Sequence, residues 1–235
     1  TQVPSTGYQW EVRTSGAAGS GSTGLFQTST TTGTSASLTA LTPSTAYSVY
    51  VRSHCDGNDY STWTSVVTFR TKAANDACSG AIAVTCGGTV SGSLSDATNE
   101  NMPVCGISGV TVQNTPGVWY KYVSNGTDVT FSTCSIFSDD TRLAVYTGSC
   151  GNMTCVGGND DNDDCLDQDL SSEVTISTVS GTTYYILVYS FSTSSTEFDL
   201  SVTCAPACSP AAANNECIYA QGITLGSTTA TQPVA

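Results

Sequence analysis

The chain has 235 residues and carries 6 Lys and Arg against 19 Asp and Glu, which gives a net charge of −13 at pH 7. This balance excludes nucleic acid as a partner, because acidic side chains repel phosphates, and no apolar run approaches the ~20 residues that cross a bilayer. Eleven cysteines accompany a single histidine. Disulfides are therefore favoured over zinc ligation, and the sequence predicts an extracellular location.

Apolar side chains recur at every second position in several segments, as in the stretch Phe198–Val202. No segment of more than a few residues shows the spacing of an amphipathic helix. Thr, Val and Tyr suit extended strands, while Gly, Asn, Asp and Ser suit the turns between them. The sequence therefore predicts an all-β fold of tandem β-sandwich domains stapled by disulfides.

The first predicted domain covers residues 1–73. Gly7–Gly16 is expected to form a strand, and Ser35–Cys55 a strand, a turn and a second strand. Ser61–Thr71 is expected to close the unit.

Leu41 to Tyr47 have the spacing of a tyrosine corner, in which the Tyr hydroxyl bonds to the backbone upstream. Together with Ser61-Thr-Trp63 and Phe69-Arg-Thr71, this segment resembles a fibronectin type III domain of secreted Bacteroidetes proteins. The resemblance implies a sandwich whose first two strands precede Tyr8. It also implies that Cys55 pairs with a cysteine in those strands.

The second predicted domain covers residues 75–207. Its landmarks resemble, in their order, a cysteine-rich pre-peptidase C-terminal β-sandwich, which implies a jelly-roll-like fold. One departure is Asp139-Asp-Thr141, where that family has Phe-Asp-Thr. The quoted segments are Asn75–Val84, Gly117–Val123, Val129–Cys134, Asp139–Asp161, Ser172–Ser190 and Phe198–Cys204.

A short internal repeat follows this domain. Asn214, Cys217 and Ala220 repeat the spacing of Asn75, Cys78 and Ala81, at an offset of 139 residues. We therefore expect residues 208–235 to begin a second, truncated copy.

The cysteine spacing suggests pairs but leaves the connectivity open, since eight cysteines allow 105 pairings. A local bridge across a hairpin-sized gap is expected between Cys150 and Cys155. The other expected pairs are Cys134–Cys165, Cys86–Cys105, Cys78–Cys204 and Cys208–Cys217.

Nine of the nineteen acidic residues lie between Asp139 and Glu173. Such crowding is unfavourable unless water or a cation screens the charges, and Ca²⁺ prefers carboxylate and amide oxygens. The predicted Ca²⁺ ligands are Asp139, Asp140, Asn159, Asp160, Asp161, Asp163 and Asp164. Two other interpretations stay open: a solvated acidic loop that only aids solubility, and a surface that binds a basic partner.

Catalysis is not expected. The single histidine, His54, lies beside Cys55, and neither Gly-x-Ser-x-Gly nor His-Glu-x-x-His occurs. The paired carboxylates lie together in one polar loop instead of being divided between a buried acid and an exposed base.

The sequence therefore predicts a structural or adhesive segment of a repetitive bacterial surface protein or filament, exported by a type IX-like route. Its expected partners are neighbouring domains, copies of the same parent chain, and surface glycans or cell-surface proteins. Neither nucleic acid nor direct membrane insertion is expected. The alternative is an accessory module that binds carbohydrate or another substrate for a secreted hydrolase.

Overall fold

A computed structural model of the chain describes residues 6–99, 105, 115–134, 140–165, 170–191 and 197–206. The chain divides into two compact units, Thr1–Cys204 and Ala205–Ala235. Apart from one short 3₁₀ turn, the described elements are strands, so the predicted all-β class is confirmed. No described helix is long and apolar enough to span a bilayer. Residues 208–235, with the expected Cys208–Cys217 pair, lie outside the described residues.

The N-terminal strands form one antiparallel sheet in the order β2-β1-β3-β4, with β5 paired to β3. The strands are β1 (Gly7–Arg13), β2 (Leu25–Thr31), β3 (Ala46–Asp56), β4 (Asp59–Tyr60) and β5 (Val67–Arg70). One face of this sheet packs around buried Trp10, Val12 and Tyr47. The Tyr47 hydroxyl accepts a hydrogen bond from the Thr42 N–H at 2.9 Å, as the spacing predicted. Whether this sheet belongs to a fibronectin type III domain ending at residue 73 remains a prediction.

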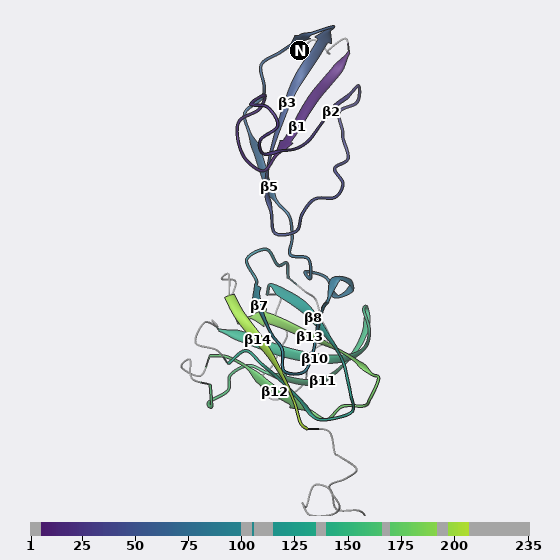
Figure 1. The fold of residues 1–235 in the computed structure, drawn as a ribbon, viewed down its shortest axis with the longest axis vertical. Coiled ribbons are helices and arrows are strands. Elements are labelled where there is room, and N and C mark those ends of the chain that lie inside the picture. Colours follow the sequence, from purple (N-terminus) through teal and green to yellow (C-terminus); the bar gives the residue numbers. More distant parts are fainter. Residues whose placement is uncertain are drawn as a thin grey trace, which may run out of the picture. The chain divides into compact units, whose positions relative to one another are not determined.

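The rest of Thr1–Cys204 forms two sheets, of order β11-β10-β13-β8-β6 and β12-β9-β14-β7 (Figure 1). All pairings are antiparallel except that of β6 with β8, which is parallel. The elements are η1 (Cys78–Gly80), β6 (Ile82–Val84), β7 (Thr89–Ser93), β8 (Gly117–Val123), β9 (Val129–Ser132), β10 (Thr141–Ser149), β11 (Asn152–Asn159), β12 (Glu173–Ile176), β13 (Thr183–Ser190) and β14 (Glu197–Cys204).

The main core lies between these two sheets. Tyr120, Leu143 and Ile186 from one sheet pack with Phe131 and Leu200 from the other. Side chains alternate along each strand, so β10 sends Ala144 and Tyr146 to the opposite face. There they join Trp119, Leu187 and Tyr189 in a second apolar cluster. This two-layer arrangement is a β-sandwich.

Four disulfides join cysteines of the sandwich. They are Cys78–Cys150, Cys86–Cys204, Cys105–Cys155 and Cys134–Cys165. The expected pair Cys134–Cys165 is present, whereas Cys150–Cys155, Cys86–Cys105 and Cys78–Cys204 were wrong.

Strand register explains why a local Cys150–Cys155 bridge does not form. Ser149 pairs with Asn152 across the β10–β11 hairpin, so Cys150 sits in its turn, while Cys155 lies opposite Tyr146. At ~3.4 Å per residue along a strand the two cysteines are roughly 13 Å apart, beyond the ~7 Å that a bridge allows between Cα atoms. Cys86 meets Cys204 instead of Cys105 because the β6–β7 turn pairs with the end of β14, where the Gly87 N–H bonds to the Val202 carbonyl.

Candidate functional site

Three carboxylates converge at one end of the β10–β11 hairpin. Asp140 directly precedes β10, and Asp160 and Asp161 directly follow β11. Because Leu143 pairs with Asn159, the start of β10 lies beside the end of β11. The three side chains place one oxygen each within 4.8 Å of one another.

Arg142 lies beside this cluster and neutralises part of its charge. Its Nε and Nη2 donate to the two carboxylate oxygens of Asp160 at 2.6 and 2.7 Å, and its guanidinium lies 4.3 Å from the centre of the Phe191 ring. The Arg142 side chain is 4 % exposed. One cation faces three carboxylates, so the cluster remains net acidic.

The surroundings of Asp140 disfavour its ionised form. Burial raises the pKa of Asp140, and repulsion from Asp161 and Asp160 raises it further, while Arg142 lowers it. Its buried Oδ1 accepts no hydrogen bond within the described part of the chain.

The backbone around the cluster is fixed by short polar contacts. The Ser172 hydroxyl lies 2.7 Å from the Thr141 carbonyl oxygen and 3.0 Å from that of Asn159, and it also contacts the Asp160 carbonyl. The bridge Cys134–Cys165 joins the residue six positions before Asp140 to the residue four positions after Asp161. The positions of the carboxylates therefore follow from strand register and not from the loop alone.

The predicted ligand set is only partly assembled. Asp140, Asp160 and Asp161 come together, whereas exposed Asp163 and Asp164 stand outside the cluster. Asp139 lies outside the described residues. The Asn159 amide is already engaged, because its Oδ1 accepts from the Glu173 N–H at 3.0 Å and its Nδ2 donates to the Asp161 carbonyl at 3.1 Å.

Sequence reasoning missed Arg142. The signal was present, since the chain has only six basic residues and one of them stands two positions after Asp140. A basic side chain so close to an acidic run in a cation-poor chain indicates an ion pair, but the sequence does not say which carboxylate it joins.

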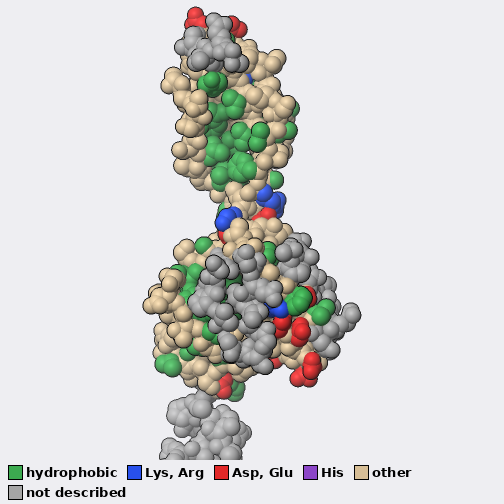
Figure 2. All heavy atoms as spheres, turned by 180° about the vertical axis from the view of Figure 1, so that it is seen from behind, with side chains coloured by type: hydrophobic (Ala, Val, Ile, Leu, Met, Phe, Trp, Pro, Cys, Tyr) green, Lys and Arg blue, Asp and Glu red, His purple; other side chains and the backbone are tan. Residues whose placement is uncertain are grey.

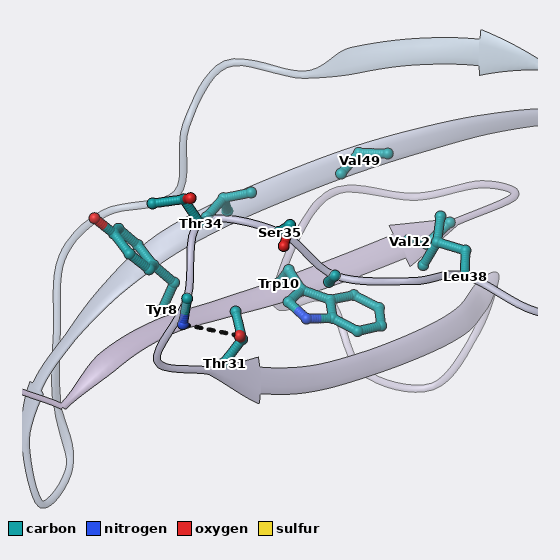
Figure 3. A pocket seen from close by; sticks show the side chains of 11 residues that line it. Tyr8, Trp10, Val12, Thr31, Thr34, Ser35, Leu38 and Val49 are labelled. Carbon is teal, nitrogen blue, oxygen red and sulfur yellow. Dashed lines mark hydrogen bonds between the residues drawn. The ribbon is translucent and has the colours of Figure 1, made fainter.

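A second candidate site is a groove of about 400 Å³ on the apolar face of the N-terminal sheet. Tyr8, Trp10, Val12 and Val49 form its floor, and residues 33–38, with Thr34 and Leu38, run along its side (Figure 3). Hydrophobic side chains gather in a broad patch over this part of the chain (Figure 2). Concave and mostly apolar surfaces of this size are where proteins bind ligands.

No family model matches the chain, and no curated protein matches it. Among solved structures, the chain is similar to a crystal structure of the pre-peptidase C-terminal domain of a collagenase from Bacillus anthracis. The identity is 16 % and the TM-score 0.35, and the alignment covers 52 % of this chain and 94 % of that one.

Proposed function

We propose that this chain is a non-catalytic structural or adhesive segment of a repetitive bacterial surface protein, exported to the cell exterior and stiffened by disulfides and Ca²⁺. The observation that carries the proposal is the set of four bridges across the sandwich, each joining segments distant in sequence. Cross-links of this kind persist in oxidising compartments and stabilise a domain by about 2–4 kcal/mol each.

A structural role is also supported by the surroundings of the single histidine. His54 stacks on Tyr60 with ring centres 4.5 Å apart, and its Nε2 lies 3.0 Å from the Gly57 carbonyl oxygen. These contacts close the β3–β4 turn. We propose that His54 acts in folding and not as a general base.

The proposed Ca²⁺ would bind Asp140, Asp160 and Asp161. Its ligand chemistry fits carboxylate oxygens, and the buried Oδ1 of Asp140 lacks a hydrogen-bond partner in the described residues. A bound ion would raise stability by about 2.7 kcal/mol at a concentration 100-fold above its Kd.

Thermal melts with Ca²⁺ and with EGTA test the ion. Wild type and the control Asp163→Asn should melt at a higher temperature in Ca²⁺, and Asp161→Asn should show no shift. An equal melting temperature for wild type in both buffers would discard the Ca²⁺ proposal without touching the structural role.

Labelling of intact cells tests the location and role. An antibody against this chain should stain unpermeabilised cells, and deleting the segment from the parent should weaken attachment to surfaces or to neighbouring cells. Staining only after permeabilisation, or thiols that are mostly unbridged in the native protein by mass spectrometry, would refute the proposal.

The second candidate is an accessory module that binds a substrate for a secreted hydrolase. The groove over Trp10 favours it, because its volume of about 400 Å³ lies within the range of ligand pockets. Quenching of tryptophan fluorescence by candidate glycans and peptides tests it, with Trp10→Phe as the comparison. Binding that survives unchanged in a variant with Leu38→Asp would place the ligand elsewhere.

A further inference from the structure

The bridge Cys86–Cys204 joins the two ends of the sandwich. Cys86 lies in the turn between β6 and β7, a short way after Ala73, which packs against the core. Cys204 is the last residue of β14. The two cysteines are 118 residues apart in sequence, so nearly the whole sandwich forms one covalent loop between them.

We propose that tension applied along the chain passes through Cys86–Cys204 and, apart from β6, leaves the strands of the two sheets unloaded. The shortest covalent route runs from Ala73 to Cys86, across the bridge, and out after Cys204. Fully extended, the segment from Ala73 to Cys86 spans roughly 45 Å, whereas the 118 residues behind the bridge would span roughly 400 Å. The sandwich therefore acts as a nearly inextensible link, and the acidic cluster keeps its geometry under load.

The leading segment is itself attached to the sandwich. The Trp119 N–H donates to the Asn75 carbonyl at 2.8 Å, and the Asn75 side-chain amide donates to the Trp119 carbonyl at 3.1 Å. The Asp76 carboxylate accepts from the Thr98 hydroxyl at 2.9 Å. A pulling force has to break these contacts and the pairing of β6 on β8 before it reaches the bridge.

The remaining bridges would take the load in a fixed order, set by the length of chain that each one bypasses. Once Cys86–Cys204 opens, the shortest route crosses Cys78–Cys150. Opening that bridge transfers tension to Cys105–Cys155, and then to Cys134–Cys165. Each bridge therefore carries force only after the previous one has been cut.

This order fixes the length released at each step. Taking extended chain at the usual rise, the four openings release roughly 160, 80, 65 and 110 Å, in that sequence. The behaviour follows from the pattern of bridges alone, whether or not the segment is adhesive.

The first bridge is accessible to a thiol. Cys86 is exposed and Cys204 is half-buried, and both sulfur atoms lie near the Tyr122 hydroxyl, at 3.1 and 3.3 Å. The thiolate of added dithiothreitol can attack one sulfur, form a mixed disulfide with it and expel the other cysteine as a thiolate.

Single-molecule pulling at constant force on the full chain, held at both ends, tests the proposal. Without reductant, wild type should lengthen in two ways. Its N-terminal sheet unfolds, and the sandwich adds less than roughly 45 Å, the extended length of the segment from Ala73 to Cys86. With dithiothreitol, further steps should follow, beginning with the one of roughly 160 Å. A release near 400 Å without reductant, or a different first step, would overturn it.

Two double variants sharpen the result. Cys86→Ser/Cys204→Ser should show the roughly 160 Å extension without reductant, because its first bridge is absent. The control Cys134→Ser/Cys165→Ser should keep the first two steps and merge the last two into one of roughly 175 Å. If the first variant does not fold, the sequence of extension steps of wild type in dithiothreitol tests the proposal by itself. A control variant that lacks the first step would contradict the proposed route.

Discussion

Arg142 holds the carboxylate of Asp160 with two parallel hydrogen bonds, from Nε at 2.6 Å and from Nη2 at 2.7 Å. Arg142 belongs to β10, and Asp160 directly follows the neighbouring strand β11. This paired geometry fixes one of the three carboxylates of the acidic cluster.

Replacing Arg142 with Met should destabilise the sandwich by about 2–4 kcal/mol. The substitution keeps most of the length of the side chain but leaves a partly buried carboxylate without its partner, which is the costly way to break an ion pair. Urea unfolding followed by far-UV circular dichroism measures the loss. Since Asp164 is exposed, Asp164→Asn serves as the control and should change stability by less than ~0.5 kcal/mol.

The Asp140→Asn variant should be more stable than wild type at neutral pH in EGTA and less stable than wild type in Ca²⁺. The pKa of Asp140 is raised in the folded protein, so ionising this group disfavours the folded state. That penalty is present above the folded pKa and disappears as the pH falls through it, where the carboxyl is protonated. The advantage of the variant in EGTA should therefore shrink on acidification.

Melts from pH 7 to pH 3 measure this effect in both buffers. A variant that is less stable than wild type at pH 7 in EGTA would contradict the assigned direction. Equal behaviour of the variant and wild type in Ca²⁺ would contradict the ligand role of Asp140.

Gly92→Ala should cost about 1–3 kcal/mol, as overpacking of a core does. A Cβ at Gly92 would lie 2.4 Å from Phe198 Cζ and 2.5 Å from the Tyr120 hydroxyl, two rings that meet edge to face with centres 6.2 Å apart. The exposed neighbour Thr89→Ala on the same strand is the control. The midpoints of chemical unfolding measure the difference between the two variants. Equal midpoints would show that the rings of Phe198 and Tyr120 move aside without cost.

Arg52 and Trp63 should show a coupling energy of about 0.5–1 kcal/mol, the range of an exposed cation–π contact. The guanidinium carbon of Arg52 lies 4.5 Å from the Trp63 ring centre and 4.0 Å from that of Tyr60. A double-mutant cycle with Arg52→Gln and Trp63→Leu measures it. If the stability losses of the two single variants add up to that of the double variant, the contact between Arg52 and Trp63 has no coupling energy.

The fold class was predictable because strand alternation is local. Phe198, Leu200 and Val202 alternate in sequence and all three are buried in β14. The bond from the Thr42 N–H to Tyr47 was predictable for the same reason, since both groups lie within one turn.

The partners in three of the four disulfides were not predictable, because they depend on which strands become neighbours. Cys204 meets Cys86 only because β14 pairs with β7, and Cys150 meets Cys78 only because the β10–β11 turn reaches η1. Likewise, strand register selects Asp160 and Asp161 from the acidic run and excludes Asp163.

The bridge Cys86–Cys204 also bears on proteolysis. A protease that cuts any exposed turn between Cys86 and Cys204 leaves both fragments on one molecule, because the bridge holds them together. On a non-reducing gel the nicked protein would run as a single band, and only a reducing gel would separate its pieces. At the proposed extracellular location, where secreted proteases act, the enclosed segment can therefore be cut without the chain being severed.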